Sequence, residues 1–278
     1  MVTTRNEGTA VADKRMFHQE IDQVRSDIVH MAALASEFIP RATEVLLSND
    51  LRGAQKLIEA DDILDDLNLQ IEERCYQILA LQQPVAIDLR VLVTAIRLTS
   101  EIERSADLMV NVAKASRRLY GAQFEPKVRG LIEQMSEEAS RLFTFAVDAY
   151  AEGDADLAAA LDDMDDRLDA LHKDYIASIF ESHQGSTLDL QPAVQLALIG
   201  RYYERVGDHA VNIGHRVQYM VTGWLPEHAG AARARARRER EAPAVTADTS
   251  GPGGDSGCRA SRGCRAGDLL HPGRRPVC

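Results

Sequence analysis

The chain has 278 residues, enough for one large domain or two small ones. An apolar content of 45% supports a packed core, and an aromatic content of only 5% favours helices over a β-sandwich. Residues 1–227 hold 22 basic and 38 acidic side chains, a net −16, whereas residues 228–278 hold 10 Arg and 5 acids, a net +5. The acidic body argues against binding to nucleic acid phosphates, and it suits cations or basic protein surfaces.

Neither a membrane segment nor a secretory leader is expected from the sequence. No run of 18 apolar residues occurs, and no apolar segment follows the N-terminal charges. Cys75 is the only cysteine before residue 258, which fits a reducing compartment and a buried core position for its thiol. We therefore expect a cytoplasmic protein without membrane insertion.

Apolar residues recur at helical spacing along most of the chain, and turn-forming residues interrupt them. Residues 1–12 are small and polar, and we expect them to be disordered. The helices that the pattern predicts cover residues 13–48, 51–83, 87–120, 127–152, 155–183 and 190–222. Three long helices joined by short turns form an antiparallel bundle. The prediction is an all-α fold, a tandem duplication of a three-helix bundle over residues 13–121 and 122–224, with a disordered Arg/Gly-rich tail over 225–278.

The amino-acid sequence of the first half recurs in part in the second half. EIERSADLMVNVAK (101–114) recurs as YYERVGDHAVNIGH (202–215), 101 positions later. Upstream, LIEADDILDDLNLQI is echoed by LAAALDDMDDRLDAL, which we read at the same offset. Because paired acids recur along with the apolar pattern, the repeat indicates duplicated chemistry.

The repeated acids form stripes on their helices. At 100° per residue, Glu103 and Asp107 lie close together on a face opposite the apolar residues, and the same holds for the other acid pairs. Solvated surface is the simplest interpretation of such stripes. Against it, acids at i and i+4 repel one another, and the arrangement occurs four times. Carboxylates from two adjacent helices are typical of a hard-cation or carboxylate-bridged metal site, and His209 and His215 would add nitrogen ligands that favour Zn or Fe at the second one.

The motif ER-x-x-D-x-x-x-N-[IV], present in both halves, and the stretch QPVAIDLRVLVTAIRLTSEIERSADLMVNVAK resemble the PhoU family of phosphate-uptake regulators over about residues 14–224. The resemblance implies two three-helix bundles, frequent dimerisation, and Fe, Zn, Mg or Mn ions on E(D)xxxD motifs. Carried over to this chain, the first site comprises Asp61, Asp65, Glu103 and Asp107, and the second comprises Asp162, Asp166, Glu204 and Asp208. One departure is that Asp88-Leu89-Arg90 becomes Asp189-Leu190-Gln191 in the second half.

The function implied by the resemblance is regulation without catalysis. The expected partners are the ATPase subunit of the phosphate ABC transporter and the phosphate-sensing histidine kinase, both damped when phosphate is sufficient, with the chain acting as a homodimer. The alternatives are a carboxylate-bridged metal enzyme or metal-storage bundle, and a purely structural bundle. Metal enzymes of this type usually carry Glu-x-x-His. Here Ala106 and Gly207 stand where that His would be.

Overall fold

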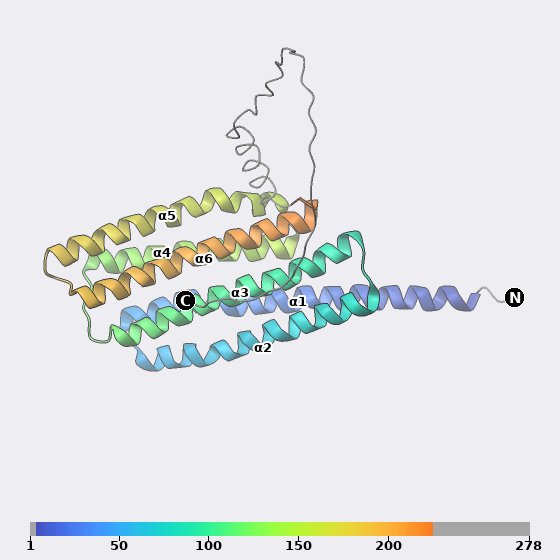
Figure 1. The fold of residues 1–278 in the computed structure, drawn as a ribbon, viewed down its shortest axis with the longest axis horizontal. Coiled ribbons are helices and arrows are strands. Elements are labelled where there is room, and N and C mark those ends of the chain that lie inside the picture. The colour runs from blue at the N-terminus through green and yellow to red at the C-terminus, as the bar shows by residue number, and fades with distance from the viewer. Residues whose placement is uncertain (1–3, 225–278) are drawn as a thin grey trace, which may run out of the picture. The chain divides into compact units, whose positions relative to one another are not determined.

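The computed structural model describes residues 4–224, and the side chains of residues 15–224. Within this range the chain forms α-helices and no strands, which confirms the predicted fold class (Figure 1). The helices are α1 (Thr4–Ser48), α2 (Leu51–Gln82), α3 (Ala86–Arg118), α4 (Pro126–Glu152), α5 (Ala155–Gln184) and α6 (Leu190–Thr222). The described residues contain no helix that is both long enough and apolar enough to cross a bilayer.

Local capping explains where the second helix of each repeat begins. The Asp50 carboxylate accepts a hydrogen bond from the backbone N–H of Arg52 at 3.0 Å. Asp154 does the same for α5, accepting from Asp156 and Leu157. These bonds satisfy amide groups that have no partner inside the helix. Gly153, with φ of +68°, ends α4 in the left-handed conformation that glycine adopts without strain.

The N-terminal prediction was wrong for residues 4–12. They form the first turns of α1 instead of a disordered segment. Extending an existing helix adds one hydrogen bond for each residue ordered, so a helix can continue past the segment that packs. The predicted tail, 225–278, lies outside the described residues.

The two three-helix bundles lie side by side and share one hydrophobic core. Helices α1–α3 pack together, as do α4–α6, and α3 also packs along α6 while α1 packs along α4 (Figure 1). Buried apolar side chains from all six helices belong to one cluster. Cys75 is fully buried within it, as predicted. The bundles are therefore two halves of one compact unit, not two separate domains.

Polar contacts also join the two halves. The buried Thr43 hydroxyl of α1 lies 2.6 Å from Ser136 Oγ of α4 and 2.7 Å from Tyr203 Oη of α6. Near the start of α3, Arg90 Nε donates to the Met220 carbonyl at the end of α6, over 3.2 Å. Such bonds require one relative placement of the helices, so they favour a single register between the halves.

The repeat has two offsets, not one. In α3 and α6, buried residues correspond at 101 positions, as in Leu98 with Ile199 and Ile102 with Tyr203. Between α2 and α5, equivalent buried residues lie 104 positions apart in the sequence. These pairs are Leu57 with Leu161, Leu64 with Leu168 and Ile71 with Tyr175. The capping residues Asp50 and Asp154 also differ by 104. The second repeat is thus three residues shorter between its second and third helices, which changes the equivalent acids.

Candidate metal centre

The first cluster forms where α2 packs against α3. Asp61 and Asp65 on α2 lie close enough to Glu103 and Asp107 on α3 for their charges to interact. Burial, and after it the neighbouring carboxylates of Asp107 and Asp65, raise the pKa of Asp61 to about 6. Burial and the Asp107 carboxylate also raise the pKa values of Asp65 and Glu103. The structure thus brings together the four residues predicted for the first site.

Few cations offset the charge of the first cluster. Among residues 15–224, none of its four carboxylates forms an ion pair within 4.0 Å. Lys114 lowers the pKa of Asp61 but does not outweigh burial and the neighbouring acids. Several carboxylates that are partly removed from water, with no close counter-ion, favour the binding of a proton or a cation.

The second cluster contains different residues from those predicted on α5. Asp165 is half-buried against α6, and burial followed by the charges of Asp169 and Asp208 raises its pKa to about 6. Asp165 and Asp169 are the equivalents of Asp61 and Asp65 at the offset of 104. The predicted pair, Asp162 and Asp166, is exposed. These two acids were chosen with the offset that holds only for the third helix of each repeat.

The glycines of α6 explain why Asp165 comes so close. A Cβ on Gly207 would lie 2.3 Å from Asp165 Oδ1 and 2.8 Å from Leu168 Cδ2. A Cβ on Gly200 would meet the Tyr175 ring at 2.6 Å, and one on Gly214 would meet the Ala158 carbonyl at 2.7 Å. Glycines spaced by seven residues thus allow α5 to pack tightly along α6. This spacing, present in the sequence, is the signal that identifies the helix face on which Asp165 packs.

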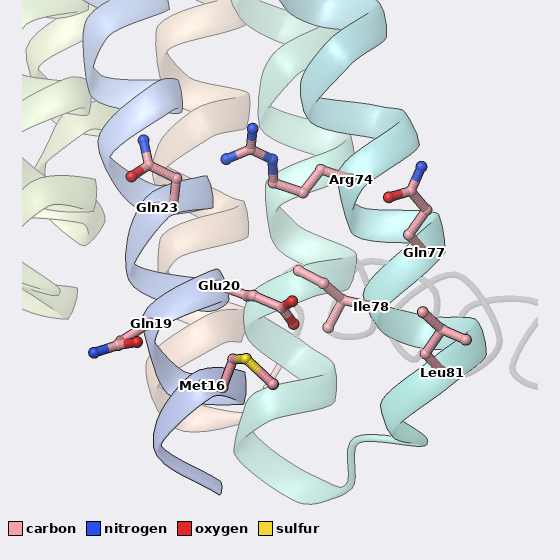
Figure 2. A pocket seen from close by; sticks show the side chains of 8 residues that line it. All are labelled: Met16, Gln19, Glu20, Gln23, Arg74, Gln77, Ile78 and Leu81. Atoms are coloured by element: carbon pink, nitrogen blue, oxygen red, sulfur yellow. The ribbon is translucent and has the colours of Figure 1, made fainter. Parts of the chain in front are cut away.

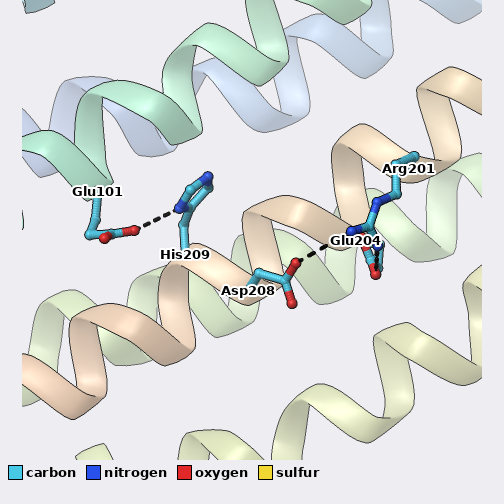
Figure 3. A network of polar contacts seen from close by, with 5 residues as sticks. All are labelled: Glu101, Arg201, Glu204, Asp208 and His209. Carbon is cyan, nitrogen blue, oxygen red and sulfur yellow. Dashed lines mark hydrogen bonds and ion pairs between the residues drawn. The ribbon is translucent and has the colours of Figure 1, made fainter. Parts of the chain in front are cut away.

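The predicted acids of α6 are present at the second cluster, but with a basic neighbour. Glu204, with only 12% of its side chain exposed, pairs with Arg201 one turn earlier. The same guanidinium lies 4.0 Å from Asp208 (Figure 3). Asp208 is exposed, as the sequence predicts for this face of the helix, whereas most of the Glu204 side chain is buried.

The two histidines predicted as ligands contact acids other than Asp165, Asp169, Glu204 and Asp208. His209 Nδ1 lies 2.7 Å from Glu101 of α3, across the boundary between the bundles. His215 Nε2 lies 3.0 Å from Asp162. Sequence reasoning missed His172, whose Nε2 is buried without a hydrogen-bond partner. Burial and the Arg201 charge lower the pKa of His172, whereas Asp169 raises it.

The donor set fits a cation by its chemistry. Two carboxylate oxygens of the second cluster, Asp165 Oδ1 and Glu204 Oε2, are buried without a hydrogen-bond partner. Such oxygens are costly to leave unpaired, and a hard cation would satisfy them. In the described residues, however, no three Asp, Glu, His or Cys side chains already converge on one ion position. Binding would therefore require side-chain rotation, and metal binding stays a prediction.

The duplicated carboxylate clusters, on two adjoining three-helix bundles, can be compared with known proteins. The PhoU domain model matches residues 28–116 and 132–217, more than half of the chain. The chain belongs to the PhoU family. The two PhoU matches enclose both clusters, because Asp61 and Asp107 fall in the first match and Asp165 and Asp208 in the second.

Relatives in the PhoU family match along nearly their whole length. Phosphate-specific transport system accessory protein PhoU homolog 1 of Mycobacterium tuberculosis is 34% identical over 214 residues, 77% of this chain and 96% of the relative. The Thermotoga maritima protein of the same name is 32% identical over 213 residues, 77% of this chain and 92% of the relative. The crystal structure of PhoU from Pseudomonas aeruginosa matches with a TM-score of 0.71 at 28% identity, covering 75% of this chain and all of that one.

A groove separate from both carboxylate clusters lies on the described part of the chain. It lies between α1 and α2, has a volume of about 350 Å³, and is shown in Figure 2. Its lining is Met16, Gln19, Glu20, Gln23, Arg74, Gln77, Ile78 and Leu81. Arg74 is engaged with Asp27 at 3.0 Å. The lining contains no Ser, Cys or His, so it has no pairing of a nucleophile with a base of the usual kind.

Proposed function

We propose that this chain is a cation-binding regulator of phosphate uptake. It would act in the cytoplasm as a homodimer and damp the phosphate ABC transporter and the histidine kinase linked to it when phosphate is sufficient. The observation that carries the proposal is the match to PhoU homolog 1 of Mycobacterium tuberculosis, a phosphate-specific transport system accessory protein, over 96% of its length. The two PhoU domain matches, over residues 28–116 and 132–217, also contain the acids of both clusters.

The residues that would hold cations lie in two groups. In the first repeat they are Asp61, Asp65, Glu103 and Asp107, and in the second they are Asp165, Asp169, Glu204 and Asp208. A bound cation would neutralise carboxylates that repel one another across the contact between two helices. The helix pairs α2–α3 and α5–α6 would then pack with less electrostatic strain, and the surface they present to a partner would become less acidic.

The arrangement supports binding without turnover. Glu103 and Glu204 are each followed three residues later by Ala106 or Gly207, so the Glu-x-x-His pair typical of carboxylate-bridged oxidases is missing at these positions. Both clusters also lie where two helices meet at the molecular surface, with Asp65, Asp107 and Asp208 exposed. This accessibility suits exchange of a cation or contact with a partner better than an enclosed reaction.

A genetic complementation experiment tests the proposed function. Cells that lack this gene and any second copy of the family should take up phosphate in excess, or express phosphate-starvation genes, in phosphate-rich medium. Wild-type chain should restore repression. A variant carrying Asp61→Asn, Glu103→Gln, Asp165→Asn and Glu204→Gln should accumulate normally but fail to restore it. Normal uptake and expression in the deletion strain would refute the regulatory role, and full complementation by the variant would refute the role of the clusters.

A further inference from the structure

The two carboxylate clusters differ in one charged residue. We propose that Arg201 is a built-in counter-ion of the second cluster, which competes with external cations there, so that the first cluster is the tighter cation site. This inference rests on the proposed function, because it assigns unequal roles to the two groups of ligands.

Arg201 makes direct contact with the two acids that α6 contributes. Its Nη1 donates to Glu204 Oε1, and its Nη2 lies 4.0 Å from Asp208 Oδ2. Figure 3 shows Arg201 beside Glu204 on the same helix, with a dashed line that joins its guanidinium to Asp208. An ion that used Glu204 and Asp208 together would have to displace this guanidinium. Displacement costs the ion-pair energy, which is larger for Glu204 because its side chain is only 12% exposed.

The first cluster has no equivalent cation. At the offset of 101 that relates α3 to α6, the residue in the place of Arg201 is Ser100. Ser100 carries no charge, and among residues 15–224 no ion pair reaches Glu103 or Asp107. The raised pKa values of Asp61, Asp65 and Glu103 agree with carboxylates that lack a close counter-ion.

The other cations near the clusters do not account for the difference. Arg104 and Arg205 follow the motif glutamates at equivalent positions in both repeats, so their presence does not distinguish the two clusters. Lys114 of the first repeat corresponds to His215 of the second. Lys114 influences Asp61 without an ion pair within 4.0 Å, whereas His215 binds Asp162, which is outside the equivalent ligand set. Among the ion pairs of residues 15–224, those of Arg201, which stands in the place of Ser100, are the ones that reach Glu204 and Asp208 on α6, and none reaches Glu103 or Asp107 on α3.

The test exchanges the two residues. Arg201→Ser gives the second cluster the residue of the first, Ser100→Arg gives the first cluster the residue of the second, and Arg205→Ser is the matched control on α6. Mn²⁺ binding to the full chain is measured by calorimetry. Asp61→Asn with Glu103→Gln, and Asp165→Asn with Glu204→Gln, assign each binding event to a cluster.

We expect wild type to bind Mn²⁺ at least about tenfold more tightly at the first cluster than at the second. Arg201→Ser should tighten the second site toward the first, Ser100→Arg should weaken the first by about tenfold, and Arg205→Ser should change neither. Equal affinities in wild type, or an unchanged second site in Arg201→Ser, would overturn the inference while leaving cation binding intact.

A measurement without metal separates this inference from the proposed function. In EDTA, Ser100→Arg should raise the melting temperature because it supplies a counter-ion, and Arg201→Ser should lower it more than Arg205→Ser does. If no variant binds Mn²⁺, cation binding as the proposed function is refuted, and the melting temperatures alone decide whether Arg201 acts as a counter-ion. Equal melting temperatures for Arg201→Ser and Arg205→Ser would show that it does not.

Discussion

His209 Nδ1 lies 2.7 Å from Glu101 Oε2, and this contact joins α6 of the second bundle to α3 of the first (Figure 3). Asn212 donates to the same carboxylate oxygen over 3.3 Å. Burial raises the pKa of Glu101, but the hydrogen bond and charge of His209, together with Asn212, outweigh burial and lower it below its ordinary value. Glu101 therefore stabilises the contact between the halves as a carboxylate.

Replacing Glu101 should weaken the association of the two bundles. We expect Glu101→Ala to lower the free energy of unfolding by about 1–3 kcal/mol, because it leaves the mostly buried His209 ring without its partner. The measurement is urea unfolding at pH 7. Glu73→Ala, which changes an exposed glutamate on α2, serves as the control. Because the pKa of Glu101 is lowered, its contribution is present above the ordinary pKa of 4.5 and is lost as the pH falls below it. An equal effect of both substitutions at pH 7 would contradict the prediction.

The metal-free protein should become more stable when the pH falls from 7 to 5. The pKa values of Asp61 and Asp165 rise from 3.8 to about 6 in the folded state. Between these values the folded state keeps protons that the unfolded chain has released, so stability falls as the pH rises through this window. Melting temperatures in EDTA at both pH values check this.

The double variant Asp61→Asn, Asp165→Asn should show a smaller change between pH 5 and pH 7 than wild type, since neither amide titrates. Asp163→Asn removes an exposed acid of α5 and should keep the wild-type dependence. A pH response of the double variant as large as that of wild type would show that other groups are responsible.

Alanine substitutions at glycines should have opposite effects in α6 and α4. Gly214→Ala places a Cβ 2.7 Å from the Ala158 carbonyl, and backbone cannot move away cheaply, so we expect a loss of about 1–3 kcal/mol. Gly130→Ala, inside α4, meets no atom within 4 Å and should stabilise by about 0.5–1 kcal/mol through helix propensity. Chemical denaturation of both variants tests the pair, and a Gly214→Ala protein as stable as wild type would contradict the tight packing of α5 on α6.

A chain that ends at Trp224 should fold as the full chain does. The last buried apolar residue described is Met220, and the Mycobacterium tuberculosis relative matches over 96% of its own length while covering 77% of this chain. The residues up to Trp224 therefore contain the hydrophobic core and the part of the chain that matches the family. Circular dichroism should show the same cooperative melting for both chains. A broad transition or a fall of several degrees in the shortened chain would show that residues 225–278 contribute to the core.

Much of the fold was predictable from local pattern. The ends of α2, α4, α5 and α6 fall within two residues of their predicted positions, because caps such as Asp50 and Gly153 and the spacing of apolar residues act within one or two turns. The start of α1 was not predictable in this way, since residues 4–12 carry no apolar pattern of their own and continue a helix that is stabilised further along.

For the site, the sequence determined that two repeats each carry paired acids on two helices, and it identified all four members of the first cluster. The sequence also identified the acids that α3 and α6 contribute to the clusters, because the segments around Glu103-Arg104 and Glu204-Arg205 align without a gap. What it did not determine was the pairing of α5 with α6. The offset of 104 depends on the length of the connection before α6, and both Asp162 and Asp165 continue an acidic stretch that looks alike in either register.

Only the tertiary structure decided which acids meet. Gly207 allows Asp165 to lie against α6, Arg201 covers Glu204, and Glu101 binds His209 and Asn212 on the opposite bundle. The physical reason is that apolar periodicity reports which face of one helix is buried, whereas burial and charge at a contact depend on the register of two helices. That register is set by side-chain packing between segments far apart in the chain.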